Sequence, residues 1–111
     1  MELDIQASRD GDVCVVTLEG EVDVYTASQL KEVLVETIEG GCANVVVDLD
    51  QVSFIDSSGL GVLVGALRRA KERAGSVRLV CARENILKIF RITGLDKVFP
   101  VFASVAEASA F

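Results

Sequence analysis

The chain has 111 residues, of which 50% are hydrophobic, and 11 basic against 17 acidic side chains give it a net charge of −6. This length and hydrophobic fraction suit one domain with a real core and are too short for two. The acidic balance argues against a nucleic-acid binder, which needs a basic face, and against a protein bound to anionic membranes. No apolar run reaches the roughly 18 residues of a membrane span, and the N-terminus lacks the features of a secretory signal, so we expect a cytoplasmic protein.

The side chains that most enzymes need are scarce in this chain. It contains no histidine, which removes Ser-His-Asp and Cys-His catalysis and histidine-based metal sites. We therefore expect a protein that is not an enzyme and that needs neither a cofactor nor a metal. The three cysteines, Cys14, Cys42 and Cys81, are widely spaced without a C-x-x-C pair, and two of them fall in expected strands, which predicts buried free thiols.

The first half of the chain predicts a hairpin, a helix and a buried strand. Residues 3–7 and 13–18 have strand patterns on either side of Asp10-Gly11, a hairpin signal, so an antiparallel pair should open the fold. Residues 26–39 have helical spacing, with Thr26 or Asp23 at the start and Gly40-Gly41 at the end. The apolar run at 44–48 is typical of a strand that is buried on both faces.

The second half alternates helices and strands. The expected elements are a helix at 57–74, a strand at 77–81, a helix at 84–93 that closes at Gly94, a weak edge strand at 97–101 interrupted by Pro100, and a short helix at 104–110 capped by Ser104. This alternation predicts an α/β fold in a single domain over residues 1–111. We expect a mixed, mostly parallel sheet of four to five strands, with an N-terminal antiparallel hairpin and about four helices.

The segment Asp56-Ser57-Ser58-Gly59 brings two hydroxyls to the expected start of a helix. The first N–H groups of a helix lack partners and carry the positive end of the dipole, which favours an anion such as a phosphate. The segment is therefore a candidate phosphoserine switch, although simple N-capping is the commoner role for Asp or Ser at this point. Capping does not explain Gly59, Gly61 and Gly65, each of which costs roughly 1 kcal/mol relative to Ala in a helix. These glycines suggest that another group approaches the backbone closely.

The helical repeat separates a core face from an outward face of this segment. The core face should hold Leu60, Leu63, Val64, Leu67, Ala70 and Ala74. The opposite face carries Ser58, Val62, Gly65 and Arg69, which are too small and apolar for an ordinary solvated face and so predict a docking strip for another protein. On this geometry Ser58 is the hydroxyl that a partner could reach, and Ser57 is a local capping or supporting group.

Several motifs in chain order resemble those of one known family. They are Gly20-Glu21-Val22-Asp23 followed by Thr26-Ala27 and Leu30, then Val46-Val47-Asp48-Leu49 with the run from Phe54 to Gly61, and finally Thr93-Gly94-Leu95 with Phe99. Together they resemble the STAS domain of bacterial anti-sigma factor antagonists, over essentially the whole chain. The resemblance implies a small protein that binds an anti-sigma factor serine kinase, releases a sigma factor and so permits transcription. It also implies inactivation when that kinase phosphorylates the antagonist, and a partner phosphatase that restores the active form.

The resemblance also implies roles for individual residues. The phosphoacceptor is the second serine of the motif, Ser58, with Asp56, Ser57 and Gly59 supporting it. The resemblance adds a partner contact at Asp23 to those that the outward face of the helix predicts, so partner contacts are expected at Asp23, Ser58, Gly61, Val62, Gly65 and Arg69. For Asp23, a turn carboxylate that helps to start the first helix is an equally good interpretation. Since neither Gly61 nor Val62 could pair with a phosphate on Ser58, phosphorylation should block docking with little change of fold.

Four other interpretations remain open. Asp48-x-Asp50 at a strand end is typical of phosphotransferases with an aspartyl nucleophile and Mg²⁺, but nothing downstream clearly supplies the required lysine and further acids. A receiver-like acceptor at Asp48 lacks the expected acidic pair after the first strand. Gly59-x-Gly61 with Gly65 misses the dinucleotide spacing by one residue. Within the same fold, the alternative is a STAS scaffold or regulatory module whose signalling or transport partner is unrelated to sigma factors.

Overall fold

Five strands form one sheet in the computed structural model, which describes residues 2–111. They are β1 (Leu3–Asp10), β2 (Val13–Val22), β3 (Asn44–Ile55), β4 (Ser76–Val80) and β5 (Val101–Phe102), and they lie side by side in that order. The β1–β2 pair is antiparallel, and every later pair is parallel. The expected mixed sheet with an N-terminal hairpin is therefore confirmed. The predicted single domain includes Met1, which lies outside the described residues.

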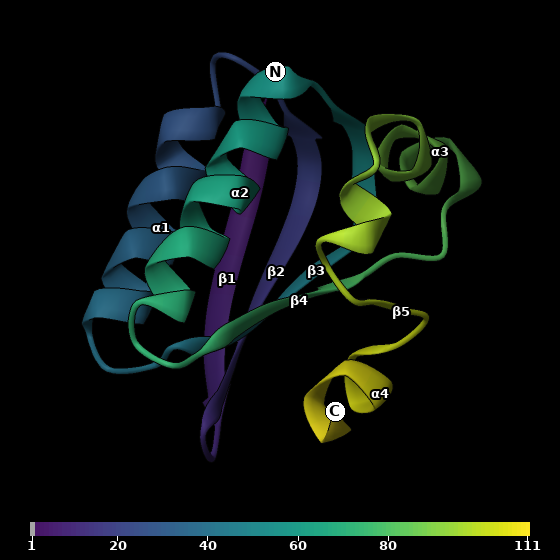
Figure 1. Cartoon of the computed structure of the whole chain (residues 1–111). Coiled ribbons are helices and arrows are strands. Elements are labelled where there is room, and N and C mark those ends of the chain that lie inside the picture. The colour runs from purple at the N-terminus through teal and green to yellow at the C-terminus, as the bar shows by residue number, and fades with distance from the viewer. Residues whose placement is uncertain (1) are drawn as a thin grey trace.

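Four α-helices cover the sheet. They are α1 (Ala27–Glu39), α2 (Ser57–Lys71), α3 (Glu84–Thr93) and α4 (Val105–Ala110), with a 3₁₀ turn η1 (Leu95–Lys97) after α3. Figure 1 shows α1 and α2 side by side on one face of the sheet, with α3 beyond them and α4 near β5. None of the helices within residues 2–111 has the length and apolar character needed to cross a membrane.

The first part of the central strand β3, from Val45 to Leu49, is buried on both faces, as its apolar run predicts. Val45 and Val47 face the main core, which they share with side chains of α1, α2 and α3. Val46 points to the other face, where it packs with Val80 and Ala108 beneath α4. A strand with helices on both sides has no solvated face, which explains why its sequence does not alternate.

Three element boundaries differ from the sequence prediction. Strand β3 continues past Asp48 to Ile55 because it keeps pairing with β2 through two irregularities in register. In the segment predicted as a strand at 97–101, Lys97 ends the η1 turn and residues 98–99 form a turn and a bend. Only Val101–Phe102 joins the sheet, at the predicted edge. Helix α2 ends at Lys71, so Ala74 is exposed with a positive φ of 58° and was wrongly assigned to the core.

The prediction of three free thiols is wrong for two of them. Cys14 and Cys42 form a disulfide with a Cα–Cα distance of 6.3 Å. Parallel pairing of Val13 with Asn44 and of Cys14 with Val45 brings the start of β2 beside the loop that precedes β3. Sequence spacing does not reveal this register. Cys81 is a buried free thiol as predicted, and its burial raises the pKa of the thiol above its ordinary value.

Loss of the disulfide should destabilise the fold. The bond closes a loop with a sequence separation of 28, which corresponds to about 2–4 kcal/mol of unfolding free energy, chiefly through the constrained unfolded chain. Urea denaturation with and without a thiol reductant measures this difference. The Cys14→Ala/Cys42→Ala variant is the control, because its unfolding midpoint should not respond to reductant. An identical midpoint for the oxidised and reduced wild type would contradict the prediction.

Candidate functional site

The N-terminus of α2 is held by the carboxylate of Asp56. As the N-cap residue, Asp56 accepts hydrogen bonds at Oδ1 from the backbone N–H of Ser58 at 2.9 Å and of Gly59 at 3.4 Å. Its own N–H donates to the carbonyl oxygen of Val22 at 3.1 Å. The cap therefore fastens the first turn of α2 to the end of β2, and the prediction of Asp56 as a supporting residue agrees with this geometry.

The two serines differ from the expected arrangement. The hydroxyl of Ser58 donates to Oδ1 of Asp56, and Ser58 is half-buried, whereas Ser57 is exposed. The expectation that Ser57 is the local capping group is therefore wrong, because Ser58 makes the contact with the N-cap carboxylate. Ser58 is the second residue of the helix, and an N-cap carboxylate points toward the second and third residues of the first turn. Ser58, and not Ser57, therefore contacts the carboxylate of Asp56.

The contact with Ser58 also sets the charge state of the carboxylate. The Ser58 hydroxyl is the main cause that lowers the pKa of Asp56 below its ordinary value of 3.8, and the backbone N–H groups of Gly59 and Ser58 lower this pKa further. Asp56 is therefore ionised at neutral pH. An ionised cap places negative charge at the positive end of the helix dipole, where it is favoured.

A groove of about 500 Å³ separates α1 from α2. The α2 wall contains all four members of the predicted docking strip, Ser58, Val62, Gly65 and Arg69, together with Gly61, which was also expected to contact a partner. The α1 wall consists of Lys31, Leu34 and Val35, and α2 with its C-cap residue adds Ala66, Arg68 and Glu72. The sequence analysis missed these six residues because it did not predict that α1 lies beside α2. Helical spacing does place the three α1 residues on a common face.

The glycines of α2 have two different structural roles. Gly59 packs against the sheet, where an added Cβ would lie 2.5 Å from Cγ1 of Val22 and 2.9 Å from Cγ1 of Ile55. An added Cβ at Gly61 or Gly65 would meet no atom within 4 Å. Packing within the chain therefore explains the first glycine only. The other two leave backbone open to the groove, where another molecule can approach.

Arg69 of the predicted strip already has a partner. Its guanidinium donates to Oε2 of Glu39 at 2.8 Å, which joins α2 to the last residue of α1. Both side chains are 40–45% exposed, so this pair contributes less than about 1 kcal/mol to stability. Its main effect is to hold the two walls together at the far end of the groove from Ser58.

Asp23 faces its own turn. The residue is 5% exposed, and its Oδ1 accepts from the backbone N–H of Tyr25 at 2.9 Å and of Thr26 at 3.1 Å. This is the geometry of the turn carboxylate that helps to start α1, and Asp23 does not line the groove. The exposed side chains of this loop are Val24, at 68%, and Tyr25, at 80%. The sequence analysis missed both, although two apolar residues in a polar turn are a visible signal.

The two carboxylates of the Asp48-x-Asp50 motif accept hydrogen bonds from backbone N–H groups. Oδ1 of Asp48 accepts from the backbone N–H of Asp50 at 3.1 Å, and Oδ1 of Asp50 accepts from that of Ala82 at 2.9 Å. Among residues 2–111, no group of three or more His, Cys, Asp or Glu side chains is placed to hold a metal ion. The two carboxylates therefore have structural partners.

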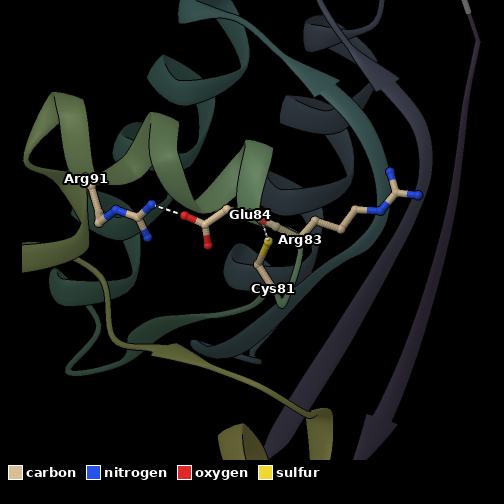
Figure 2. A network of polar contacts seen from close by, with 4 residues as sticks. All are labelled: Cys81, Arg83, Glu84 and Arg91. Atoms are coloured by element: carbon tan, nitrogen blue, oxygen red, sulfur yellow. Dashed lines mark hydrogen bonds and ion pairs between the residues drawn. The ribbon is translucent and has the colours of Figure 1, made fainter.

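A polar network follows β4 at the start of α3 (Figure 2). The Cys81 thiol lies 3.7 Å from the carbonyl oxygen of Arg83, whose guanidinium donates to the carbonyl oxygen of Val52 at 3.1 Å. Glu84 forms an ion pair with Arg91 along α3. These contacts attach α3 to β3, and none of these side chains lines the α1–α2 groove.

Alanine substitutions should separate the two kinds of glycine. Gly61→Ala and Gly65→Ala should each raise the free energy of unfolding by about 0.5–1 kcal/mol, because alanine is the better helix former and open space receives its methyl group. Gly59→Ala should lower it by about 1 kcal/mol or more, because the clash with β2 and β3 outweighs the helical gain. Urea denaturation of the three variants checks the signs. Destabilisation by all three substitutions would contradict the assignment of Gly61 and Gly65.

The Asp56 cap should make stability depend on pH. An acid whose pKa is lower in the folded state stabilises the fold above its unfolded pKa of about 3.9 and loses this contribution as the pH falls through the folded pKa. The unfolding midpoints of wild type and Asp56→Asn should therefore differ at neutral pH and converge below about pH 4. Ser58→Ala, which removes the main cause of the lowered pKa, should show a weaker dependence. A difference between wild type and Asp56→Asn that stays constant with pH would contradict this role.

Comparison with known proteins identifies the fold and its relatives. The family model of the STAS domain matches residues 4–108. The anti-sigma-B factor antagonist of Bacillus subtilis is 36% identical over 103 residues, which cover 93% of this chain and 94% of the relative. An anti-sigma factor antagonist from Mycobacterium paratuberculosis has a crystal structure that matches with a TM-score of 0.90 at 26% identity, covering 98% of this chain and 92% of the other.

A further solved structure is that of the Bacillus cell fate determinant SpoIIAA in the phosphorylated form. It matches with a TM-score of 0.76 at 26% identity and covers 96% of this chain and 97% of the other. The matches extend over nearly the full length of each protein and include the segments that build the α1–α2 groove. The chain therefore belongs to the STAS domain family and, within it, to the group of anti-sigma factor antagonists.

Proposed function

We propose that this protein binds an anti-sigma factor with serine kinase activity, thereby releases a sigma factor, and is switched off by phosphorylation of Ser58. The observation that carries the proposal is the groove between α1 and α2, which has Ser58 among its lining residues and Asp56 beside it. The antagonists of known name among its relatives support the first part. A relative of known structure in a phosphorylated form supports the second.

The contact between Asp56 and Ser58 prepares the hydroxyl for transfer. Because the Ser58 hydroxyl donates to Oδ1 of Asp56, its oxygen is held in one orientation with its lone pairs free for an incoming phosphoryl group. The lowered pKa of Asp56 makes the carboxylate a good acceptor but a weak base. Asp56 thus positions the acceptor, and the kinase supplies ATP and the remaining chemistry.

Phosphorylation changes this contact from attraction to repulsion. A phosphate adds about 1.5 to 2 negative charges and, when fully ionised, has no proton to donate, so it faces the Asp56 carboxylate as a like charge. Helix α2 stays in place because Leu60, Leu63 and Leu67 remain buried in the core. The modification therefore acts by bulk, charge and solvation at the groove, and the fold changes little.

The proposal includes further partners and a location. A phosphoserine phosphatase would remove the phosphate and restore binding. The protein itself acts by binding and is not an enzyme, and it works in the cytoplasm, where its kinase and sigma factor meet. That compartment keeps most thiols reduced, so the Cys14–Cys42 bond would respond to its redox state.

Phosphate mapping tests the proposal. Wild type, Ser57→Ala and Ser58→Ala are incubated with ATP and each purified anti-sigma factor kinase of the source genome, and the phosphate is located by peptide mass spectrometry. We expect phosphate on Ser58, retained in Ser57→Ala and lost in Ser58→Ala. Release of the sigma factor from its complex by the unphosphorylated protein is the second readout.

Two outcomes would change the proposal. Phosphate on Ser57 would move the switch to the more exposed hydroxyl. If no candidate kinase modifies or binds the protein, the only role that remains for Asp56 and the serines is to cap the helix. Capture by a scaffold or transporter would then favour a regulatory STAS module over a sigma factor antagonist.

A further inference from the structure

The α1–α2 groove carries a charge opposite to that of the whole protein. The chain has a net charge of −6, yet three of the four charged residues that line the groove are Lys31, Arg68 and Arg69, and the fourth is Glu72. Arg69 is paired with Glu39. Lys31 and Arg68 are exposed, and within residues 2–111 neither forms an ion pair. Two unpaired cations thus flank a groove on an acidic molecule.

Between Lys31 and Arg68, the floor of the groove is formed by apolar side chains and by two glycines. Leu34 and Ala66 are buried, and Val35 and Val62 are half-buried. The missing side chains of Gly61 and Gly65 leave open space above the backbone. A surface of this kind fits an apolar side chain of a partner that lies between carboxylates.

We propose that the groove receives an acidic segment of the anti-sigma partner, with one apolar side chain on the floor and carboxylates at Lys31 and Arg68. This inference rests on the proposed function, since it describes the partner's docking element. Charge complementarity selects this occupant, because a basic segment would meet Lys31 and Arg68 as like charges.

The stretch of α2 from Ser58 to Arg68 sets the length of the segment. Helices α1 and α2 run side by side with their N-termini at the same end of the sheet (Figure 1). Lys31 lies in the early turns of α1, at the end of the groove that contains Ser58, and Arg68 follows Ser58 by ten residues along α2. At 1.5 Å per residue this places the two ends of the groove roughly 15 Å apart. A helix of about ten residues, or an extended stretch of about five, would reach both.

The same charges give the phosphate a specific effect. Lys31 and Arg68 contribute two positive charges, and a phosphate on Ser58 contributes about 1.5 to 2 negative ones. Since Glu72 adds one negative charge, phosphorylation turns the groove from net positive to net negative and places an anion where the partner presents its own. The switch excludes an acidic partner by charge as well as by bulk.

Charge reversal tests this inference on the intact chain. The variants are Lys31→Glu and Arg68→Glu, and the control is Lys71→Glu, which makes the same charge change on an exposed position of α2 outside the groove. The probe is the purified kinase that phosphorylates wild type in the mapping experiment, and its Kd is measured by calorimetry. We expect each groove variant to weaken binding about tenfold or more, and the control to stay within about twofold. Binding to wild type should also weaken as salt rises from about 0.1 M to about 1 M.

The outcomes separate this inference from the proposed function. If the kinase binds the groove variants as tightly as wild type, the inference is overturned and the proposed function still stands. If it binds them more tightly, the partner's segment is basic and the inference is also overturned. A wild type that no candidate kinase binds would overturn both. Self-association of wild type that the groove variants abolish would assign the groove to a second copy of this chain. Urea denaturation shows whether each variant is folded. Lys31→Gln or Arg68→Gln replaces a charge-reversal variant that does not fold, and each should lose less binding affinity than the glutamate variant.

Discussion

The carboxylate of Asp56 determines where α2 begins, and the geometry of the site depends on that point. The residue follows directly after β3, and its N–H donates to the carbonyl oxygen of Val22 at the end of β2. Its Oδ1 receives two backbone N–H groups and the hydroxyl of Ser58. One residue, through its backbone N–H and its side chain, thereby links two neighbouring strands to a helix and orients the candidate acceptor. An ionised carboxylate can do this at a helix N-terminus because the dipole favours its charge.

Asp23 has the equivalent position one strand earlier. It follows β2, and its Oδ1 accepts two backbone N–H groups in the turn that leads into α1. Because β2 and β3 are parallel neighbours, both turns lie at the same end of the sheet, where the carboxyl ends of these strands are. The two helices therefore start together and run side by side, and the groove is the space between them. Two carboxylate turns and one parallel pairing are sufficient to position it.

The groove is maintained at some cost to helix stability. Gly61 and Gly65 have open space above them, so alanine at either position would strengthen α2 without a clash. Positions that sacrifice stability without serving the packing of the chain are expected where a surface must receive another molecule. The unpaired charges of Lys31 and Arg68 are of the same kind, since internal partners would stabilise the fold more but would remove their charge from the groove.

The features that the sequence by itself determined are local. The helical pattern at 84–93 that closes at Gly94 predicted α3 at the residues where it occurs, and Ser104 was correctly predicted to cap the last helix. The alternation of strands and helices predicted the fold class, and the motif from Asp56 to Gly59 indicated the N-terminus of α2. Each of these depends on the order of residues within one element or across one turn. Propensity and periodicity report that order directly.

Only the tertiary structure decided which distant segments meet. It paired Cys14 with Cys42, extended β3 to Ile55, and brought Lys31 opposite the strip that begins at Ser58. These outcomes follow from the register of β2 on β3 and from the packing of α1 beside α2. Hydrophobic periodicity shows which face of an element is buried, but it carries no information about what that face lies against.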